Sequence, residues 1–135
     1  MNKMNLKKFS FVLIALTLIL SGCGAPDGVS FPNLTDGQMV SSPVMVEFGV
    51  SGMEIKPAGD IVKGTGHHHI IIDGNWIKTG DLVPADDTHI HFGKGQTETT
   101  LDLAPGEHTL TLQFANGAHQ SYGEAWSKTI TITVE

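Results

Sequence analysis

The sequence of 135 residues contains a single cysteine, Cys23, and no arginine. One cysteine excludes an intramolecular disulfide, so the fold must be stable without a covalent link between distant segments. Its permanent positive side-chain charge comes from eight lysines, against 14 acidic residues. This excess of acid leaves little positive surface for a phosphate backbone, so no nucleic-acid partner is expected.

The chain also lacks a hydrophobic run long enough to span a membrane. The longest run, residues 9–20, has 12 residues, whereas a transmembrane helix needs ~20. It follows a segment with three lysines and no acid, and small residues come after it, an order typical of a secretory signal. Residues 1–22 are therefore predicted to be an export signal.

Residues 20–23 (LSGC) resemble the lipobox of bacterial lipoproteins, in which small residues precede the cysteine that receives diacylglycerol. The resemblance implies that Cys23 is lipidated and holds the protein on the membrane of a bacterial cell envelope. Gly24 follows the cysteine, and by the bacterial sorting rule this implies the outer membrane where the organism has one. Ordinary cleavage at the small residues is the alternative, and it would leave a free thiol near the N-terminus.

The predicted mature chain begins with a short segment rich in glycine and proline, residues 23–29 (CGAPDGV). This segment is predicted to carry the lipid and to act as a flexible tether. Residues 30–135 are predicted to form a single domain around one core. With five lysines and all 14 acidic residues, the mature chain has a net charge of about −9, which is compatible with attracting cations.

Short strand-like runs recur between turn residues, and no helical period of comparable strength is present. In residues 108–114 and 128–134, apolar side chains alternate with threonine or glutamine, which predicts strands with one buried and one exposed face. Similar runs cover residues 44–50, 68–73, 89–92 and 97–103.

Turn residues and the spacing of the runs indicate the fold class. Pro105-Gly106 and Asn116-Gly117 follow strand-like runs and suit tight connections in an antiparallel sheet. Six or seven short strands in about 100 residues predict an all-β fold, an immunoglobulin-like antiparallel β-sandwich of about seven strands. A small β-barrel is the alternative. Residues 74–88 have no clear period and are predicted to form a long loop, with room for a short edge strand.

Seven histidines lie in the predicted mature domain, and five of them form two groups, residues 67–69 and residues 89–91. Residues two apart in a strand share a face, so each group can direct two imidazoles toward one metal ion. A further histidine falls in a hairpin-like stretch that could place its ring over the end of the sandwich. The candidate metal ligands are His67, His69, His89, His91 and His119.

Imidazole ligands favour Cu(II) or Zn(II) over Mg(II) or Ca(II), so copper or zinc is the expected cofactor. For any single histidine, a hydrogen-bonded or solvent-facing role is the alternative, and His108 is expected to have such a role. Met39 and Met45 are expected to fill the core, which leaves Met53 as the one methionine that could add a soft ligand. Candidate acids for orienting the histidine rings are Asp73, Asp86, Asp87 and Glu98.

The expected faces of the two histidine strands differ. Ile90 and Phe92 alternate with His89 and His91, so burial of the apolar pair would leave these histidines on the outer face of the sheet. Residues 70–72 are all isoleucine, which predicts a strand buried on both faces. His68 would then share a face with two of these isoleucines, and His67 and His69 would lie on the other.

Several longer motifs coincide with the histidine groups. They are GTGHHH (64–69) with Ile72-Asp73, HFGKGQTE (91–98), and GAHQSYG (117–123). Through these motifs the chain resembles a bacterial family of exported small domains of unknown function, some of whose members are labelled rod-shape-determining proteins. The resemblance implies a site at the histidines and carries over no established activity.

Three functions are considered. The first is a non-enzymatic envelope protein that binds copper or zinc. The second is a structural or adhesive module that binds an envelope protein or a glycan, for which Trp76, Tyr122 and Trp126 are candidate anchors. An enzyme is not expected: residues 89–93 (HIHFG) resemble a strand of copper/zinc superoxide dismutase, but the paired cysteines of that family and a nucleophile arrangement are lacking.

Overall fold

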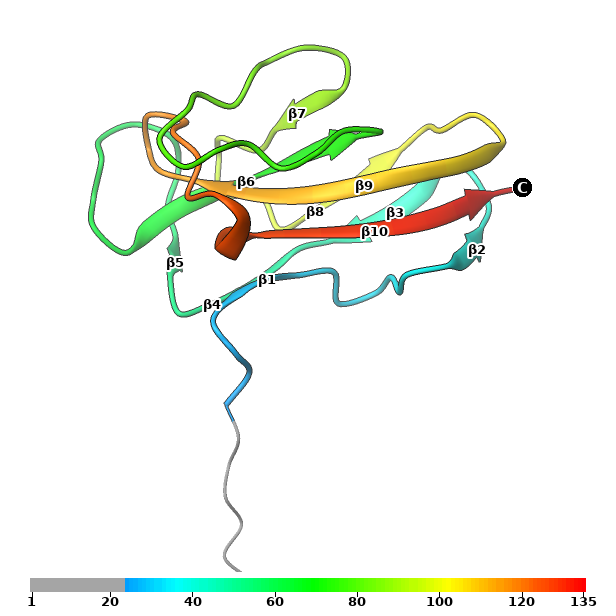
Figure 1. Cartoon of the computed structure of the whole chain (residues 1–135), viewed down its shortest axis with the longest axis horizontal. Coiled ribbons are helices and arrows are strands. Elements are labelled where there is room, and N and C mark those ends of the chain that lie inside the picture. The colour runs from blue at the N-terminus through cyan, green and yellow to red at the C-terminus, as the bar shows by residue number, and fades with distance from the viewer. Residues whose placement is uncertain (1–23) are drawn as a thin grey trace, which may run out of the picture.

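The computed structural model describes residues 24–135, which are almost entirely β-structure (Figure 1). The predicted export signal, residues 1–22, and the predicted lipidation site, Cys23, lie outside the described residues. Within residues 24–135, no helix is long and apolar enough to cross a membrane. The elements are β1 (Gly28–Ser30), β2 (Gln38–Val40), β3 (Val44–Glu47), β4 (Gly49–Ser51), β5 (Glu54–Ile55), β6 (Thr65–Ile72), β7 (His89–His91), β8 (Glu98–Leu101), β9 (Gly106–Ala115), the 3-10 turn η1 (Glu124–Trp126) and β10 (Ser127–Val134).

The largest sheet has six strands in the order β2-β10-β9-β6-β5, with β7 also paired to β6. Its long strands β6, β9 and β10 lie side by side in Figure 1 and pair antiparallel. The short pairs β1-β4 and β3-β8 form separate sheets. The all-β sandwich prediction is confirmed, with ten strands in residues 24–135 rather than about seven and with parallel pairing at β2-β10 and β5-β6.

The hydrophobic core lies between the large sheet and the β3-β8 pair. Leu110 and Leu112 of β9 and Ile132 of β10 face it with no exposed surface, and Val46 of β3 meets them from the other side. The alternation in residues 108–114 and 128–134 directs these apolar side chains to one face, as predicted. Each fully buried side chain of this size contributes about 1.5–3 kcal/mol to stability.

The opposite face of β6 and β9 is buried as well, because residues 74–88 cross it as a long loop (Figure 1). The side chain of Gln113 accepts a hydrogen bond from the N–H of Ile77 at 3.0 Å, and the hydroxyl of Thr111 donates to the carbonyl of Gly74 at 2.8 Å. Thr111 and Gln113 are fully buried, so the prediction of an exposed face on β9 is wrong. The predicted loop is confirmed, and it contains no strand.

Strand β6 is buried on both faces, as its run of isoleucines predicts. His68 lies on the core side, with its ring 5.5 Å from that of Phe48 and 4.9 Å from that of Phe114. His67 and His69 lie on the other side, beneath the long loop. The three consecutive histidines therefore lie in two different environments, the core on one side of β6 and the space under the long loop on the other.

Met39 and Met45 do not fill the core, so that prediction is wrong. They are 63% and 51% exposed. Val44 and Val46 take the two buried positions of β3, which turns Met45 outward, and Met39 lies on the edge strand β2. Met53 is partly buried in the turn between β4 and β5.

Candidate metal centre

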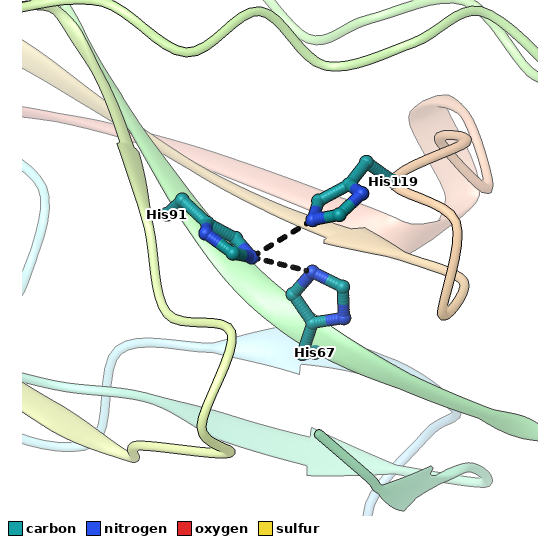
Figure 2. Close-up of side chains that lie close together, drawn as sticks. All are labelled: His67, His91 and His119. Atoms are coloured by element: carbon teal, nitrogen blue, oxygen red, sulfur yellow. Dashed lines mark hydrogen bonds between the residues drawn. The ribbon is translucent and has the colours of Figure 1, made fainter. Parts of the chain in front are cut away.

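Three histidines converge from three separate elements (Figure 2). The Nε2 atom of His91 lies 3.1 Å from Nε2 of His67 and 3.0 Å from Nε2 of His119. One nitrogen from each ring lies within 4.8 Å of the other two. His67 is fully buried, His119 is partly buried and His91 is exposed, so the group reaches the surface at one side. We call these residues the three-histidine group.

The sheet register brings two of the rings together. β6 and β7 are antiparallel, and His91 stands opposite His69. His67 lies two residues before His69 on β6 and therefore on the same face. On the other side of β6, His67 pairs with Ala115, the last residue of β9. The chain leaving β9 therefore turns back close to His67.

That turn holds the third ring. The side-chain oxygen of Asn116 accepts the N–H groups of Ala118 and Gln120, both at 3.0 Å. The carbonyl of His119 accepts the N–H of Val83 at 2.9 Å, which fastens the turn to the long loop. His119 itself adopts a φ of 65°, a left-handed conformation that is uncommon outside glycine and asparagine. The tight turn is thus built so that this ring faces the other two.

His69 adjoins the three-histidine group without joining it. Its ring is 4.8 Å from that of His67 and stacks on that of His91 at 5.1 Å. Both of its nitrogens are buried and have no hydrogen-bond partner among residues 24–135. A neutral imidazole carries one N–H donor and one acceptor, so unpartnered buried nitrogens cost free energy. Nδ1 of His67 is also buried without a hydrogen-bond partner among these residues.

Burial and neighbouring imidazoles lower the pKa values of His67, His69 and His91, which favours the uncharged form of these rings. Burial, and then the neighbouring His91 and His119, lower the pKa of His67 to about 4. Burial and the surrounding imidazoles lower the pKa of His69 to about 3. Burial, and then His119, lower the pKa of His91. Neutral imidazole is the form that ligates metals, so these residues are ready to accept an ion near neutral pH.

His89 stands apart from the group. It shares a face with His91, but its Nδ1 lies 2.8 Å from the carboxylate of Asp86, which also accepts the N–H of Thr88 and of His89 itself. These contacts lower the pKa of Asp86 to about 2, with the His89 hydrogen bond as the largest cause. Of the five candidate ligands, His89 is therefore one that the fold does not bring to the convergence point.

The candidate acids also lie elsewhere. Asp73 accepts a hydrogen bond from His108 at 2.9 Å, which is consistent with the structural role expected for that histidine. Asp86 orients His89, and Asp87 and Glu98 are exposed. Among the described residues, none of the four makes a hydrogen bond to the three-histidine group. The orienting role proposed for them from the sequence is therefore not found at this site.

Gly93, which the sequence analysis did not single out, makes room for the ring of His91. A Cβ at this position would collide with that ring. Its backbone does not have a positive φ, so alanine fits the local conformation. The motif HFGKGQTE places this glycine two residues after His91, in the turn that follows β7, and a glycine there is a signal of close approach.

If the three-histidine group binds a metal ion, Gly93→Ala is expected to displace the His91 ring and to weaken that binding by about 10-fold, the scale of a change that misorients a ligand. The fold should survive, because the collision is with a side chain at the surface. Calorimetric titration with Cu(II) measures the effect. Gly24→Ala is the matched control, since a Cβ there has no neighbour within 4 Å. Equal affinities for the two variants would contradict the role given to Gly93.

Comparison with known proteins gives one match. A family model described as a domain of unknown function (DUF4399) matches residues 46–135. The matched residues include the three-histidine group and His69. No curated protein and no solved structure matches the chain.

Proposed function

We propose that this chain, which belongs to the DUF4399 family of domains of unknown function, binds one copper or zinc ion through His67, His91 and His119. The observation that carries the proposal is the convergence of three rings, in which Nε2 of His67 and Nε2 of His119 lie 3.1 and 3.0 Å from Nε2 of His91. These rings come from two strands and a turn, and only the folded chain brings them together.

The spacing suits a metal ion. With metal–nitrogen bonds of about 2.0–2.1 Å, two imidazole nitrogens of a tetrahedral site lie about 3.3 Å apart. The two close pairs in the three-histidine group are slightly shorter than this, so small outward movements of the rings would seat an ion. Two of the three rings, those of His91 and His119, lie at or near the surface, where less of the surrounding structure opposes such movements.

The donor set argues for the identity of the ion. Three neutral imidazoles and no carboxylate suit Cu(II) or Zn(II), while Mg(II) and Ca(II) prefer oxygen. The fold supplies the ligands in a fixed arrangement: β6 and β7 orient two rings, and the Asn116 turn orients the third. We propose binding and retention of the ion, rather than catalysis, as the activity.

Titration of the purified protein with Cu(II) and with Zn(II) in a calorimeter tests this proposal. We expect one ion per chain with a Kd below about 10 μM for at least one of the two metals. Mg(II) should give no saturable heat. The proposal fails if neither copper nor zinc binds in this range.

The proposed place of action is the bacterial envelope, with the domain anchored through lipid on Cys23. The lysine-rich start, the apolar run and the LSGC stretch support this assignment. Incorporation of labelled fatty acid in cells, and its loss in Cys23→Ser, is the test. A labelled Cys23→Ser protein would contradict lipidation at this residue.

A second candidate function is binding of an envelope protein or a glycan. Trp76 and Leu82 favour it, because both are exposed on the long loop, at 39% and 66%. Tyr122 and Trp126 give it little support, because both are partly buried and pack against Phe114. A partner that is captured equally with and without a chelator would favour this function over metal binding.

A further inference from the structure

A cavity of about 260 Å³ opens beside the three-histidine group. It is small compared with pockets that hold drug-sized ligands, which start at about 300 Å³. One side is formed by imidazoles and the other by an apolar stretch of the long loop. The lining residues are His69, His91, His119, Leu82, Val83, Pro84 and Ala85.

The cavity lies where a further ligand of the ion would have to enter. His91 and His119 line it, whereas His67 does not, so it opens on one side of the convergence point seen in Figure 2. Three protein ligands leave a fourth position of a tetrahedral ion open. A molecule in the cavity that contacts the ion would occupy this fourth position.

His69 supplies a polar group in this cavity. It is only 1% exposed, and neither of its nitrogens has a partner among the described residues. Its ring stacks on that of His91, so it is held next to a ligand of the ion. Both nitrogens are buried, so a small rotation of the ring would be needed for its N–H to donate to a hydrogen-bond acceptor in the cavity.

The charge balance indicates the class of molecule. An ion held by three neutral imidazoles keeps its double positive charge, since no carboxylate belongs to the three-histidine group. In a pocket with an apolar wall, an uncompensated charge is costly, and an anion would reduce that cost. The cavity has room for a small anion beside the ion.

We propose that this cavity binds a small anion, which occupies the open position of the ion and accepts a hydrogen bond from His69. The inference rests on the metal site proposed above. It assigns His69 to the bound anion rather than to the ion, and it makes residues 82–85 the apolar wall beside the anion.

Titration of the Cu(II)-loaded protein with azide is the experiment. Azide bound to Cu(II) gives a charge-transfer band in visible absorption, and electron paramagnetic resonance reports the nitrogen ligands independently. We expect a saturable band and a changed resonance spectrum, with copper retained at one ion per chain. Copper that loads with histidine ligands but does not respond to azide would overturn this inference and leave the metal site standing.

Two variants separate the roles of the cavity residues. Ala85→Trp fills the cavity from an exposed position and should weaken azide binding by about 10-fold or more while copper affinity stays within about 3-fold. Ala104→Trp, at an exposed position on a distant turn, is the matched control and should change neither affinity. Equal azide affinity in both variants would overturn the cavity assignment.

His69→Phe keeps an aromatic ring at this position but removes the two imidazole nitrogens. We expect copper affinity within about 3-fold of the parent and azide affinity lowered by about 10-fold, as for loss of a hydrogen bond to a charged group. If copper affinity falls by about 100-fold and azide no longer binds, His69 is itself a ligand and the inference is overturned. Failure of the parent protein to bind copper or zinc at all would overturn the proposed function and this inference together.

Discussion

Replacement of His91 by alanine is expected to weaken Cu(II) or Zn(II) binding by about 100-fold or more. His91 is the residue whose Nε2 lies within 3.1 Å of both partner nitrogens, so its loss removes a ligand and both close pairs. Mutation of a residue that only orients a metal ligand commonly lowers metal affinity by 10–100-fold, and loss of a direct ligand should lower it at least as much. Isothermal titration calorimetry of the purified variant measures the affinity.

The choice of His91 keeps the result interpretable. Its side chain is exposed, so alanine creates no cavity in the core, and circular dichroism of the metal-free variant should match that of the parent. His89→Ala is the matched control, because His89 is on the same strand and face but is held by Asp86. Retained affinity in His91→Ala, or an equal loss in His89→Ala, would contradict the assignment.

Gln113→Leu is expected to destabilise the metal-free fold by about 2–4 kcal/mol. Gln113 is fully buried, and its side chain accepts the N–H of Ile77 and donates to the carbonyls of Gly123 and Trp126 at 3.1–3.2 Å. Leucine has a similar volume but no polar atoms, so the N–H of Ile77 and the carbonyl of Trp126 would lose this partner, whereas the carbonyl of Gly123 still accepts the N–H of Trp126 at 3.2 Å. Each such group costs about 1–3 kcal/mol. Urea unfolding in the presence of a chelator measures the change.

Gln96→Leu is the control for this substitution. Gln96 is exposed and makes one hydrogen bond, from the N–H of Lys94 at 2.8 Å, which water can replace. We expect its stability to change by less than about 0.5 kcal/mol. If Gln113→Leu behaves like Gln96→Leu, the long loop is not fixed to the sheet by this side chain.

The contrast between β9 and β10 shows which part of the fold could be predicted from sequence. Alternation located both strands and their apolar faces. It could not reveal that residues 74–88 fold back over β9, because a loop without a period carries no signal for where it packs. The polar face of β9 is buried by that loop, whereas Lys128 and Thr129 of β10 remain exposed. A buried glutamine and an exposed one look alike in sequence until their hydrogen-bond partners are known.

The histidines show the same limit at the site. The two-residue period placed His67 with His69 and His89 with His91 on common faces, which agrees with the register. A shared face does not fix position along the strand: in the antiparallel pair, His91 stands opposite His69, and His89 stands opposite Ile71, further from His67. Asp86, three residues before His89, then holds the His89 ring away from the three-histidine group. The convergence of His119 depends on the hydrogen bonds of Asn116, which no spacing rule predicts.

The three proposed ligands are far apart in the sequence. Between His67 and His119 lie the rest of β6, the long loop, β7, β8 and β9, so no short peptide of this chain contains all three residues. If the proposed site binds an ion, we expect binding to be coupled to the completion of the tertiary structure. Under the proposed export to the envelope, the metal available where the last strands assemble, rather than where the chain is synthesised, would then determine which ion is bound.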